Sequence, residues 1–255
     1  MKKTILLSND DGISSAGLNA LAGALEPLGK TYIVAPDREQ SASSHALSIH
    51  RPLRIDKVTE NSYSVDGTPT DCVNLAINGL LKDNKPDLVV SGINKGENLG
   101  DDVTYSGTVS AAMEGTLLGI PSIALSLQGR NDFDFTASCT YSALIAEYVL
   151  ECGLPKDILL NVNIPNLDTD NIKGIKITRQ GKRVYSDAVV EKKDPRGREY
   201  YWIGGDELGS VDLENSDIDA VKNGFVSITP IKLDLTDYEY IKFLEKDLLK
   251  IKNHA

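Results

Sequence analysis

The amino-acid sequence predicts an α/β protein: a Rossmann-like, doubly wound and mainly parallel sheet, followed by a C-terminal β-hairpin extension and a terminal helix. Residues 1–165 alternate short apolar segments with longer amphipathic ones, which is typical of a parallel sheet covered by helices on both faces. Three apolar segments end in an abrupt change to polar residues, as strands do at the carboxyl edge of such a sheet. After residue 165 the alternation stops and strand-like segments follow one another, which predicts the hairpin extension.

The sheet is expected to begin with residues 4–8, an apolar run long enough for one buried strand. Residues 16–28 carry apolar side chains with helical spacing, and Gly29 is expected to end that helix. Residues 31–35 are predicted to form a second buried strand. The polar loop 37–45 follows it, and such loops inside compact domains are usually functional or mobile, although a solvated connection explains the same residues.

The rest of the first 165 residues continues this alternation. Further strands are predicted at 53–58, 62–65, 88–90, 121–127 and 158–164. Further helices are predicted from about 68 to 81, over 105–118 and over 136–150. The first of these helices has Thr68 or Thr70 as a possible N-cap and Pro69 in its first turn, a combination typical of a helix start.

The second part of the chain, residues 166–255, is expected to extend a single domain whose core is residues 1–165. Strands are predicted at 172–178, 184–190, 198–203 and 225–231, and a terminal helix at 238–252. The charged turn 191–197 makes the second and third of these strands a hairpin. Its residues Tyr200, Tyr201 and Trp202 are too apolar for a free arm, so we expect them to be buried against the domain or a second subunit.

Composition and charge narrow the function classes. The chain is 41% hydrophobic and 25% charged, as in ordinary globular proteins, and no stretch reaches the roughly 20 apolar residues of a membrane span. The net charge of −10 argues against binding of long nucleic acid. The N-terminus lacks the pattern of a signal peptide, so a cytoplasmic location is expected. The cysteines Cys72, Cys139 and Cys152 are expected to be small buried residues, not a disulfide framework or a zinc site.

Three loops that follow predicted strands carry polar groups suited to a metal ion. The first loop has Asp10 and Asp11, the second has Ser41, Ser43, Ser44 and His45, and the third has Asn94 and Asn98. Two adjacent carboxylates at a sheet mouth stay ionised only when a cation compensates them. Oxygen ligands without a Cys or His cluster favour Mg²⁺ or Mn²⁺ over Zn²⁺. The alternative is a simple turn, because Asp-Gly is also a strong turn signal.

A predicted helix start lies immediately after the third loop. Ser106, Gly107 and Thr108 combine free backbone N–H groups, a positive helix dipole and two hydroxyls, which together suit a phosphate group. The alternative is that the two hydroxyls only cap the helix. A metal pocket and a phosphate site at one sheet mouth predict metal-assisted hydrolysis of a phosphate ester.

Several long segments of the chain resemble the SurE family of stationary-phase survival nucleotidases, also known as SurE acid phosphatases. These segments are residues 8–12, 35–45, 67–73, 91–94, 100–108, 194–197, 201–204 and 224–230. The resemblance implies hydrolysis of nucleoside 5′- and 3′-monophosphates, with some action on short polyphosphate. It also implies one Mg²⁺ or Mn²⁺ ion per subunit, held by Asp10, Asp11, Ser41 and Asn94. A homodimer or tetramer with exchanged C-terminal elements is a further implication, and membranes and long nucleic acids are not expected partners.

The expected mechanism assigns a role to each group. The metal lowers the pKa of a water molecule and neutralises phosphate charge, while Asp10 or Asp11 orients the water. The predicted catalytic residues are Asp10, Asp11 and Ser106, and the predicted phosphate-binding residues are Asn98, Ser106, Gly107 and Thr108. His45 is a candidate general acid, although a single loop histidine is more often a surface residue, and His50 and His254 are weaker candidates.

Three other functions fit the sequence less well. A haloacid dehalogenase-like phosphatase would use Asp10 as a nucleophile, but the Asp-x-Asp-x-Thr or Asp-x-Asp-x-Val pattern is absent. A non-catalytic nucleotide sensor would need a phosphate site but would not need paired carboxylates. A dinucleotide-binding dehydrogenase is disfavoured because no Gly-x-Gly-x-x-Gly follows the first strand.

Overall fold

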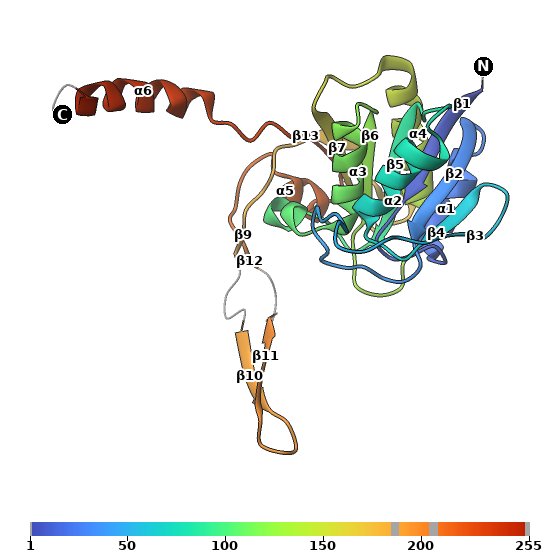
Figure 1. The fold of residues 1–255 in the computed structure, drawn as a ribbon, viewed down its shortest axis with the longest axis horizontal. Helices are drawn as coiled ribbons and strands as arrows, with labels where there is room; N and C mark the ends of the chain where they lie inside the picture. Colours follow the sequence, from blue (N-terminus) through green and yellow to red (C-terminus); the bar gives the residue numbers. More distant parts are fainter. Residues whose placement is uncertain (1, 185–188, 204–208, 253–255) are drawn as a thin grey trace.

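A nine-stranded sheet forms the centre of the computed structural model, which describes residues 2–184, 189–203 and 209–252 (Figure 1). In order across the sheet, the strands are β3 (Ile55–Lys57), β4 (Ser62–Val65), β2 (Gly29–Pro36), β1 (Lys3–Ser8), β5 (Leu88–Lys95), β6 (Ser122–Leu127), β7 (Ile158–Ile164), β13 (Val226–Lys232) and β8 (Ile175–Ile177). The six strands from β4 to β7 run parallel, whereas β3 and β13 pair antiparallel with their inner neighbours. The predicted doubly wound, mainly parallel sheet is therefore confirmed.

Helices cover both faces of this sheet. Helices α1 (Ala16–Leu25) and α4 (Phe135–Cys152) pack on one face, and α2 (Pro69–Leu75) and α3 (Gly107–Leu117) pack together on the other. Strand β1 alternates accordingly: Ile5 and Leu7 belong to the core on the α1 side, and Leu6 to the core on the α2 side. A strand buried on both faces needs such a continuous apolar run.

Several boundaries differ from the prediction, among them the end of α1 and the end of β5. Helix α1 ends at Leu25, just before Pro27, and Gly29 is not its stop signal but the first residue of β2. A Cβ atom at position 29 would lie 2.6 Å from the carbonyl oxygen of Lys3, so glycine lets β2 approach β1 closely. Strand β5 continues to Lys95, because it pairs with β6 again after an irregularity between Ser91 and Asn94.

The start of α2 follows the predicted pattern. Thr68 is the N-cap, its hydroxyl accepts a hydrogen bond from the backbone N–H of Asp71, and Pro69 is in the first turn. A π-helical segment, η1 (Ala76–Leu80), continues α2 to the predicted end of the helix. The third helix, α3, begins after its N-cap Ser106, close to the predicted start.

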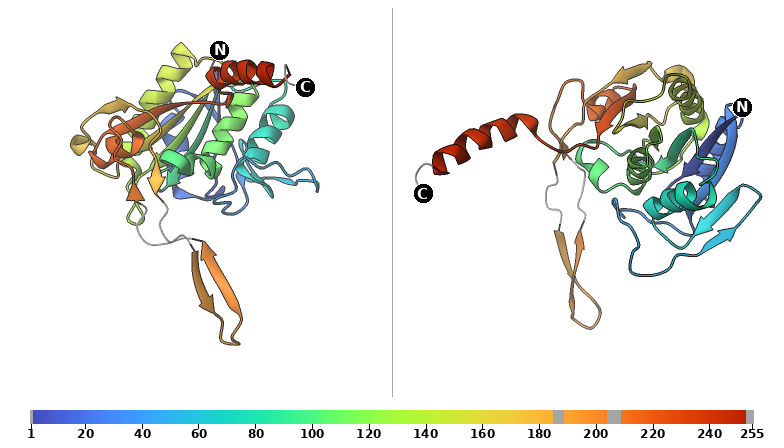
Figure 2. Two further views of the ribbon diagram at one scale, coloured as in Figure 1. Left: turned by 90° about the vertical axis from the view of Figure 1, so that its left-hand side faces the viewer. Right: turned by 45° about the horizontal axis from the view of Figure 1, so that its top comes forward.

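Part of the C-terminal extension joins the sheet and part projects from it. Strands β8 and β13 lie at the sheet edge, and the short helix α5 (Asp217–Lys222), which the sequence did not predict, packs next to β13. The predicted hairpin is β10 (Val189–Lys193) paired with β11 (Glu199–Ile203). This hairpin and α6 (Tyr238–Lys252) both extend away from the body (Figures 1 and 2). Residues 185–188 of the predicted strand 184–190 lie outside the described residues.

The surface bears on two further expectations. Tyr201 and Trp202 are 57% and 63% exposed, so the chain itself does not bury the hairpin aromatics. All three cysteines are free, but Cys152 is exposed because it is the last residue of α4, so the expectation of burial was wrong there. None of the helices in the described part of the chain is long and apolar enough to cross a lipid bilayer.

Candidate active site

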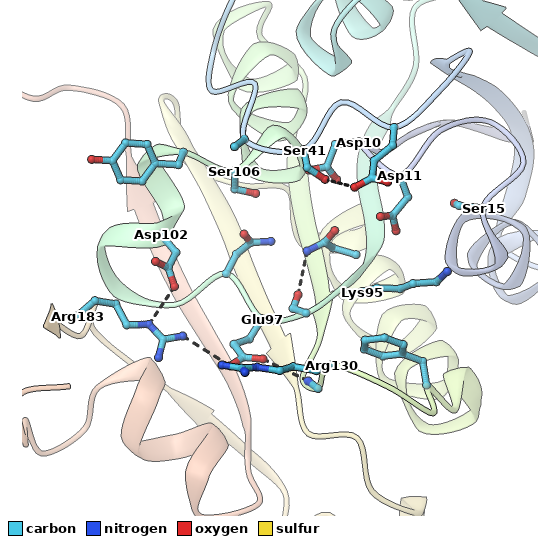
Figure 3. Close-up of a pocket in the computed structure, with 18 of the residues that line it drawn as sticks. Asp10, Asp11, Ser15, Ser41, Lys95, Glu97, Asp102, Ser106, Arg130 and Arg183 are labelled. Carbon is cyan, nitrogen blue, oxygen red and sulfur yellow. Dashed lines mark hydrogen bonds and ion pairs between the residues drawn. The ribbon is translucent and has the colours of Figure 1, made fainter. Parts of the chain in front are cut away.

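A cavity of about 870 Å³ opens where the loops after β1, β2 and β5 meet. It is lined by six of the residues singled out in the sequence: Asp10, Asp11, Ser41, Asn94, Asn98 and Ser106. Figure 3 shows Asp10, Asp11, Ser41 and Ser106 together at one side of this cavity. The parallel strands bring their carboxyl ends to one edge, so residues far apart in the sequence become neighbours.

The loop after β1 places two carboxyl groups next to each other in a largely dry environment. Asp10 is only 5% exposed. Burial raises the pKa of Asp10 above its ordinary value. Burial, and then the charge of Asp10, raise the pKa of Asp11 to about 6. Neither carboxylate forms an ion pair with a basic residue in the described chain, so a bound cation could compensate their negative charge.

Buried oxygen atoms without a hydrogen-bond partner lie on Asp11 and on nearby residues, and of these residues only Asp11 lines the cavity. The Oδ2 atom of Asp11, the Oδ1 atom of Asn9 and the Oγ atom of Ser43 are buried and have no hydrogen-bond partner among the described residues. Buried polar atoms without a partner are costly and normally indicate a bound ion or water. The described residues contain no group of three or more His, Cys, Asp or Glu side chains arranged for a metal. The donors here are a mixed oxygen set, which suits Mg²⁺ or Mn²⁺.

The loop after β2 is tied directly to the loop after β1. The backbone N–H of Gln40 donates to the carbonyl oxygen of Asp10 at 2.8 Å, and that of Ile13 donates to the carbonyl oxygen of Pro36 at 2.8 Å. Gly12 has a φ of +93° where the two loops meet, a conformation that favours glycine. The hydroxyl of Ser41 lines the cavity and donates to Glu39 at 2.6 Å. Ser41 is thereby held on the same side as the carboxylates.

The loop after β5 is fixed by a buried network of asparagines. The backbone N–H of Asn98 donates to Asn163 at 2.8 Å, and its carbonyl oxygen accepts hydrogen bonds from Asn161 and Asn163. The side-chain amide of Asn98 donates to Ser126 at 2.7 Å. The amide of Asn94 donates to the carbonyl oxygen of Gly96 at 2.9 Å. Asn161 and Asn163 were missed in the sequence, although two polar residues with period-2 spacing in an apolar strand are a detectable signal.

The start of α3 contacts the carboxylates directly. Ser106 lines the cavity, and its hydroxyl accepts a hydrogen bond from the backbone N–H of Val109 as the N-cap. Thr108 is fully buried, and its hydroxyl donates to Asp10. A Cβ atom on Gly107 would lie 2.8 Å from both Cβ of Asp10 and Oγ of Ser43. Of the three predicted phosphate-binding residues at this helix start, only Ser106 therefore presents its side chain to the cavity.

The histidine candidates lie elsewhere. His45 does not line the cavity; its Nε2 atom lies 2.8 Å from the carboxylate of Glu114 in α3. His50 is exposed in the loop that precedes β3. His254 lies outside the described residues.

The opposite side of the cavity carries charges that the sequence did not identify. Figure 3 shows Glu97, Arg130 and Arg183 there, away from the carboxylate pair. Arg183 pairs with Asp102 at 2.9 Å and with Glu97 at 3.6 Å. Lys95 also lines the cavity and lowers the pKa of Asp11, an influence smaller than those of burial and Asp10. Lys95 could have been noticed beside Asn94, but no local pattern connects Arg130 or Arg183 to this site.

Comparisons with known proteins show the family of this chain. Residues 5–187 match the family model described as survival protein SurE. A protein named 5′-nucleotidase SurE from Geotalea daltonii is 56% identical over 246 residues, which cover 95% of this chain and 98% of the relative. A protein of that name from Aquifex aeolicus is 51% identical over 243 residues, covering 95% and 97%.

A crystal structure of a SurE protein from Aquifex aeolicus superposes with a TM-score of 0.84 and 50% identity. The match covers 95% of this chain and 99% of that one. The similarity thus spans the sheet, the cavity loops and most of the C-terminal extension. The chain belongs to the SurE family.

Proposed function

We propose that this protein is a metal-dependent 5′-nucleotidase that hydrolyses nucleoside monophosphates to nucleoside and phosphate. The observation that carries the proposal is the pair of desolvated carboxyl groups at one cavity, one of which, Asp10, is hydrogen-bonded to the first turn of α3. Relatives that are 50–56% identical over nearly the whole chain carry the name 5′-nucleotidase SurE, which supports the same activity.

The donors proposed for one divalent cation per subunit, Mg²⁺ or Mn²⁺, are Asp10, Asp11, Ser41 and Asn94. Such a cation, when bound, neutralises phosphate charge and makes an attacking water more acidic. Asp11 is the less buried carboxylate and has an unpartnered oxygen, so we assign it the role of orienting that water and accepting its proton. Asp10 is held by Thr108 and serves mainly as a fixed negative ligand.

The phosphoryl group is expected at the start of α3. The free N–H groups of the first turn and the helix dipole attract its oxygens. Ser106 and Asn98 both line this cavity, so we assign them the role of holding these oxygens in line with the attacking water. Thr108 and Gly107 contribute through their backbone and through their contact with Asp10.

The size of the cavity supports a proposal about the finer substrate range. At about 870 Å³ it exceeds what a phosphate group alone needs, and Arg130 and Arg183 add positive charge opposite the carboxylates (Figure 3). We therefore extend the proposal to 3′-monophosphates and short polyphosphate, both of which place further groups beyond the reacting phosphate.

The experiment is phosphate release from a panel of nucleoside 5′- and 3′-monophosphates and tripolyphosphate, with added Mg²⁺ or Mn²⁺ and again after exhaustive chelation. We expect hydrolysis of the nucleotides with metal and loss of nearly all activity without it. Full activity in excess chelator would reject the metal mechanism. If the protein binds nucleotide but hydrolyses none with either metal, the enzyme proposal is rejected and a non-catalytic nucleotide sensor is the better description.

We also propose that the chain assembles as a homodimer or tetramer through its C-terminal elements. Exposed apolar side chains are concentrated on the hairpin and on α6: Tyr200, Tyr201, Trp202, Ile203, Tyr240, Ile241, Phe243, Leu244 and Leu248. A two-stranded hairpin and a single helix have too little core to keep such groups in water. A second copy, exchanging these elements, would cover them.

A further inference from the structure

The segment 37–54, between β2 and β3, contains Ser41 and Ser43 but has no helix or strand of its own. Ala42 has a φ of 55° and Ser44 a φ of 51°, left-handed conformations that L-residues with side chains rarely adopt. Each such residue costs free energy and persists only where surrounding contacts hold it. The position of Ser41 therefore depends on anchors elsewhere in the segment.

Asp71 of α2 holds this segment at Ser48, and the buried side-chain anchor nearer to Ser41 is Glu114, on α3. Its side chain is 6% exposed, and it accepts hydrogen bonds from His45 Nε2 at 2.8 Å and from the Asn74 amide of α2 at 2.7 Å. Burial by itself raises the pKa of Glu114, but the hydrogen bonds from His45 and Asn74 outweigh it and hold the pKa below the ordinary value. A buried ionised carboxylate is stable only with such partners. Glu114 does not line the cavity, so it does not contact substrate there.

His45 lies four residues after Ser41, and the chain between them follows the start of α3. The backbone N–H of Ser44 donates to the carbonyl oxygen of Tyr105 at 3.2 Å, and Ser43 lies against Gly107. His45 then reaches Glu114 further along the same helix. Because α3 also holds Asp10 through Thr108, one helix positions two of the proposed cation donors.

We propose that His45 and Glu114 form a positioning pair that fixes the loop 37–45 on α3, so that Ser41 faces Asp10 and Asp11. This inference rests on the proposed function, because it gives the pair a role toward the cation and the reaction. His45 is then a positioning residue and not the general acid. Asn74 keeps Glu114 hydrogen-bonded when His45 is removed, so loss of His45 frees the loop while the core stays intact.

The test compares full-length wild type with His45→Ala, His45→Gln and Glu114→Gln. A glutamine at position 45 can donate from an atom close to the position of Nε2, so it should restore the contact that alanine removes. The matched control is His50→Ala, which removes the exposed histidine of the same segment. The readouts are Mn²⁺ affinity by titration calorimetry, the rate of tryptic cleavage after the exposed Arg38, thermal melting, and the pH profile of kcat for a nucleoside monophosphate.

We expect His45→Ala to bind Mn²⁺ at least about 10-fold more weakly, the lower end of the range for residues that orient metal ligands. Cleavage after Arg38 should become faster, while the shape of the pH profile stays the same. Glu114→Gln should also bind Mn²⁺ more weakly and be cleaved faster after Arg38. His45→Gln should recover most of the Mn²⁺ affinity, and His50→Ala should match wild type in both measurements.

Unchanged Mn²⁺ affinity and unchanged cleavage in His45→Ala would overturn the pairing. Loss of one limb of the pH profile, with both of those readouts unchanged, would make His45 a proton donor instead. Wild type that binds Mn²⁺ without hydrolysing nucleotides would reject the proposed function but not the pair. Wild type that binds no Mn²⁺ would reject the metal mechanism, and the cleavage rates would then decide whether His45 holds the loop.

Discussion

The hydroxyl of Thr108 donates a hydrogen bond to the carboxylate of Asp10, so the first turn of α3 directly holds the loop after β1. Both groups are buried, Thr108 completely and Asp10 to 5% exposure. A hydrogen bond in such a place fixes the direction of the Asp10 side chain, and it is strongest when the carboxyl group is ionised. The carboxylates after β1 and the proposed phosphate site at the start of α3 are therefore directly connected.

Thr108→Val should remove this hydrogen bond while keeping the shape of the side chain. We expect a loss of about 10- to 100-fold in kcat/KM and in Mn²⁺ affinity, the usual effect of releasing a group that orients a metal ligand. Thr108→Ser keeps the hydroxyl and should stay close to wild type. Steady-state hydrolysis and calorimetric titration measure both effects, and wild-type values in Thr108→Val would show that the hydrogen bond is dispensable.

Gly107→Ala should damage both stability and activity. The new methyl group would lie 2.8 Å from Asp10 and Ser43, so the carboxylate or the loop must move, at a cost of about 1–3 kcal/mol. Gly23→Ala in α1 is the matched control, because a Cβ atom there meets nothing within 4 Å. The control should gain up to about 1 kcal/mol through helix propensity. Equal unfolding free energies for the two variants in denaturant would contradict the packing argument.

Asp11→Asn should stabilise the metal-free protein while abolishing metal binding. The folded protein raises the pKa of Asp11 from 3.8 to about 6, so it keeps a proton that the unfolded chain releases. Stability therefore falls as pH rises through about 4 to 6, and above that window the ionised carboxylate destabilises the fold. In excess chelator, we expect Asp11→Asn to melt at a higher temperature than wild type at pH 8. The difference in melting temperature should be smaller at pH 5. A lower melting temperature than wild type at pH 8 would refute this.

Tyr105→Ala should weaken the binding of nucleotides selectively. The Tyr105 ring lines the cavity beside Ser106 and is 60% exposed, which leaves a face available for stacking on a base. Stacking of a base on an aromatic residue contributes about 1–3 kcal/mol, so KM for a nucleoside monophosphate should rise about 10-fold or more. KM for ribose 5-phosphate, which has no base, should stay unchanged, and Tyr148→Ala on α4 is the control. An equal rise for both substrates would assign Tyr105 a structural role.

Disrupting the exposed apolar stripe of α6 should break the assembly. Ile241, Leu244 and Leu248 recur at helical spacing and are 39%, 41% and 55% exposed. Leu244→Asp should yield monomers at micromolar concentration in light scattering, whereas the neighbouring Lys246→Asp should leave the oligomer intact. A wild-type protein that is already monomeric at that concentration would reject the proposed assembly.

Much of the proposed site could be predicted from local sequence features. Asp10, Asp11 and the polar loops that contain Ser41 and Asn94 follow apolar runs, and a parallel sheet collects such points at one edge. The choice of Ser41 and Asn94 among the polar residues of those loops came from the resemblance to the SurE family. The N-cap Ser106 was also visible, as a hydroxyl residue before a helix. Placing these residues at one cavity required only the fold class and the order of the segments.

The sequence alone determined the alternation of elements, the carboxylate pair and the helix start, because hydrophobic period and polarity changes are properties of neighbouring residues. Only the tertiary structure decided which distant groups meet. It brought Arg183 to Asp102, turned His45 toward Glu114 and not the cavity, and directed the Thr108 hydroxyl to Asp10. Such contacts depend on how helices pack against the sheet, since side chains far apart in sequence become neighbours only when the layers close around a common core.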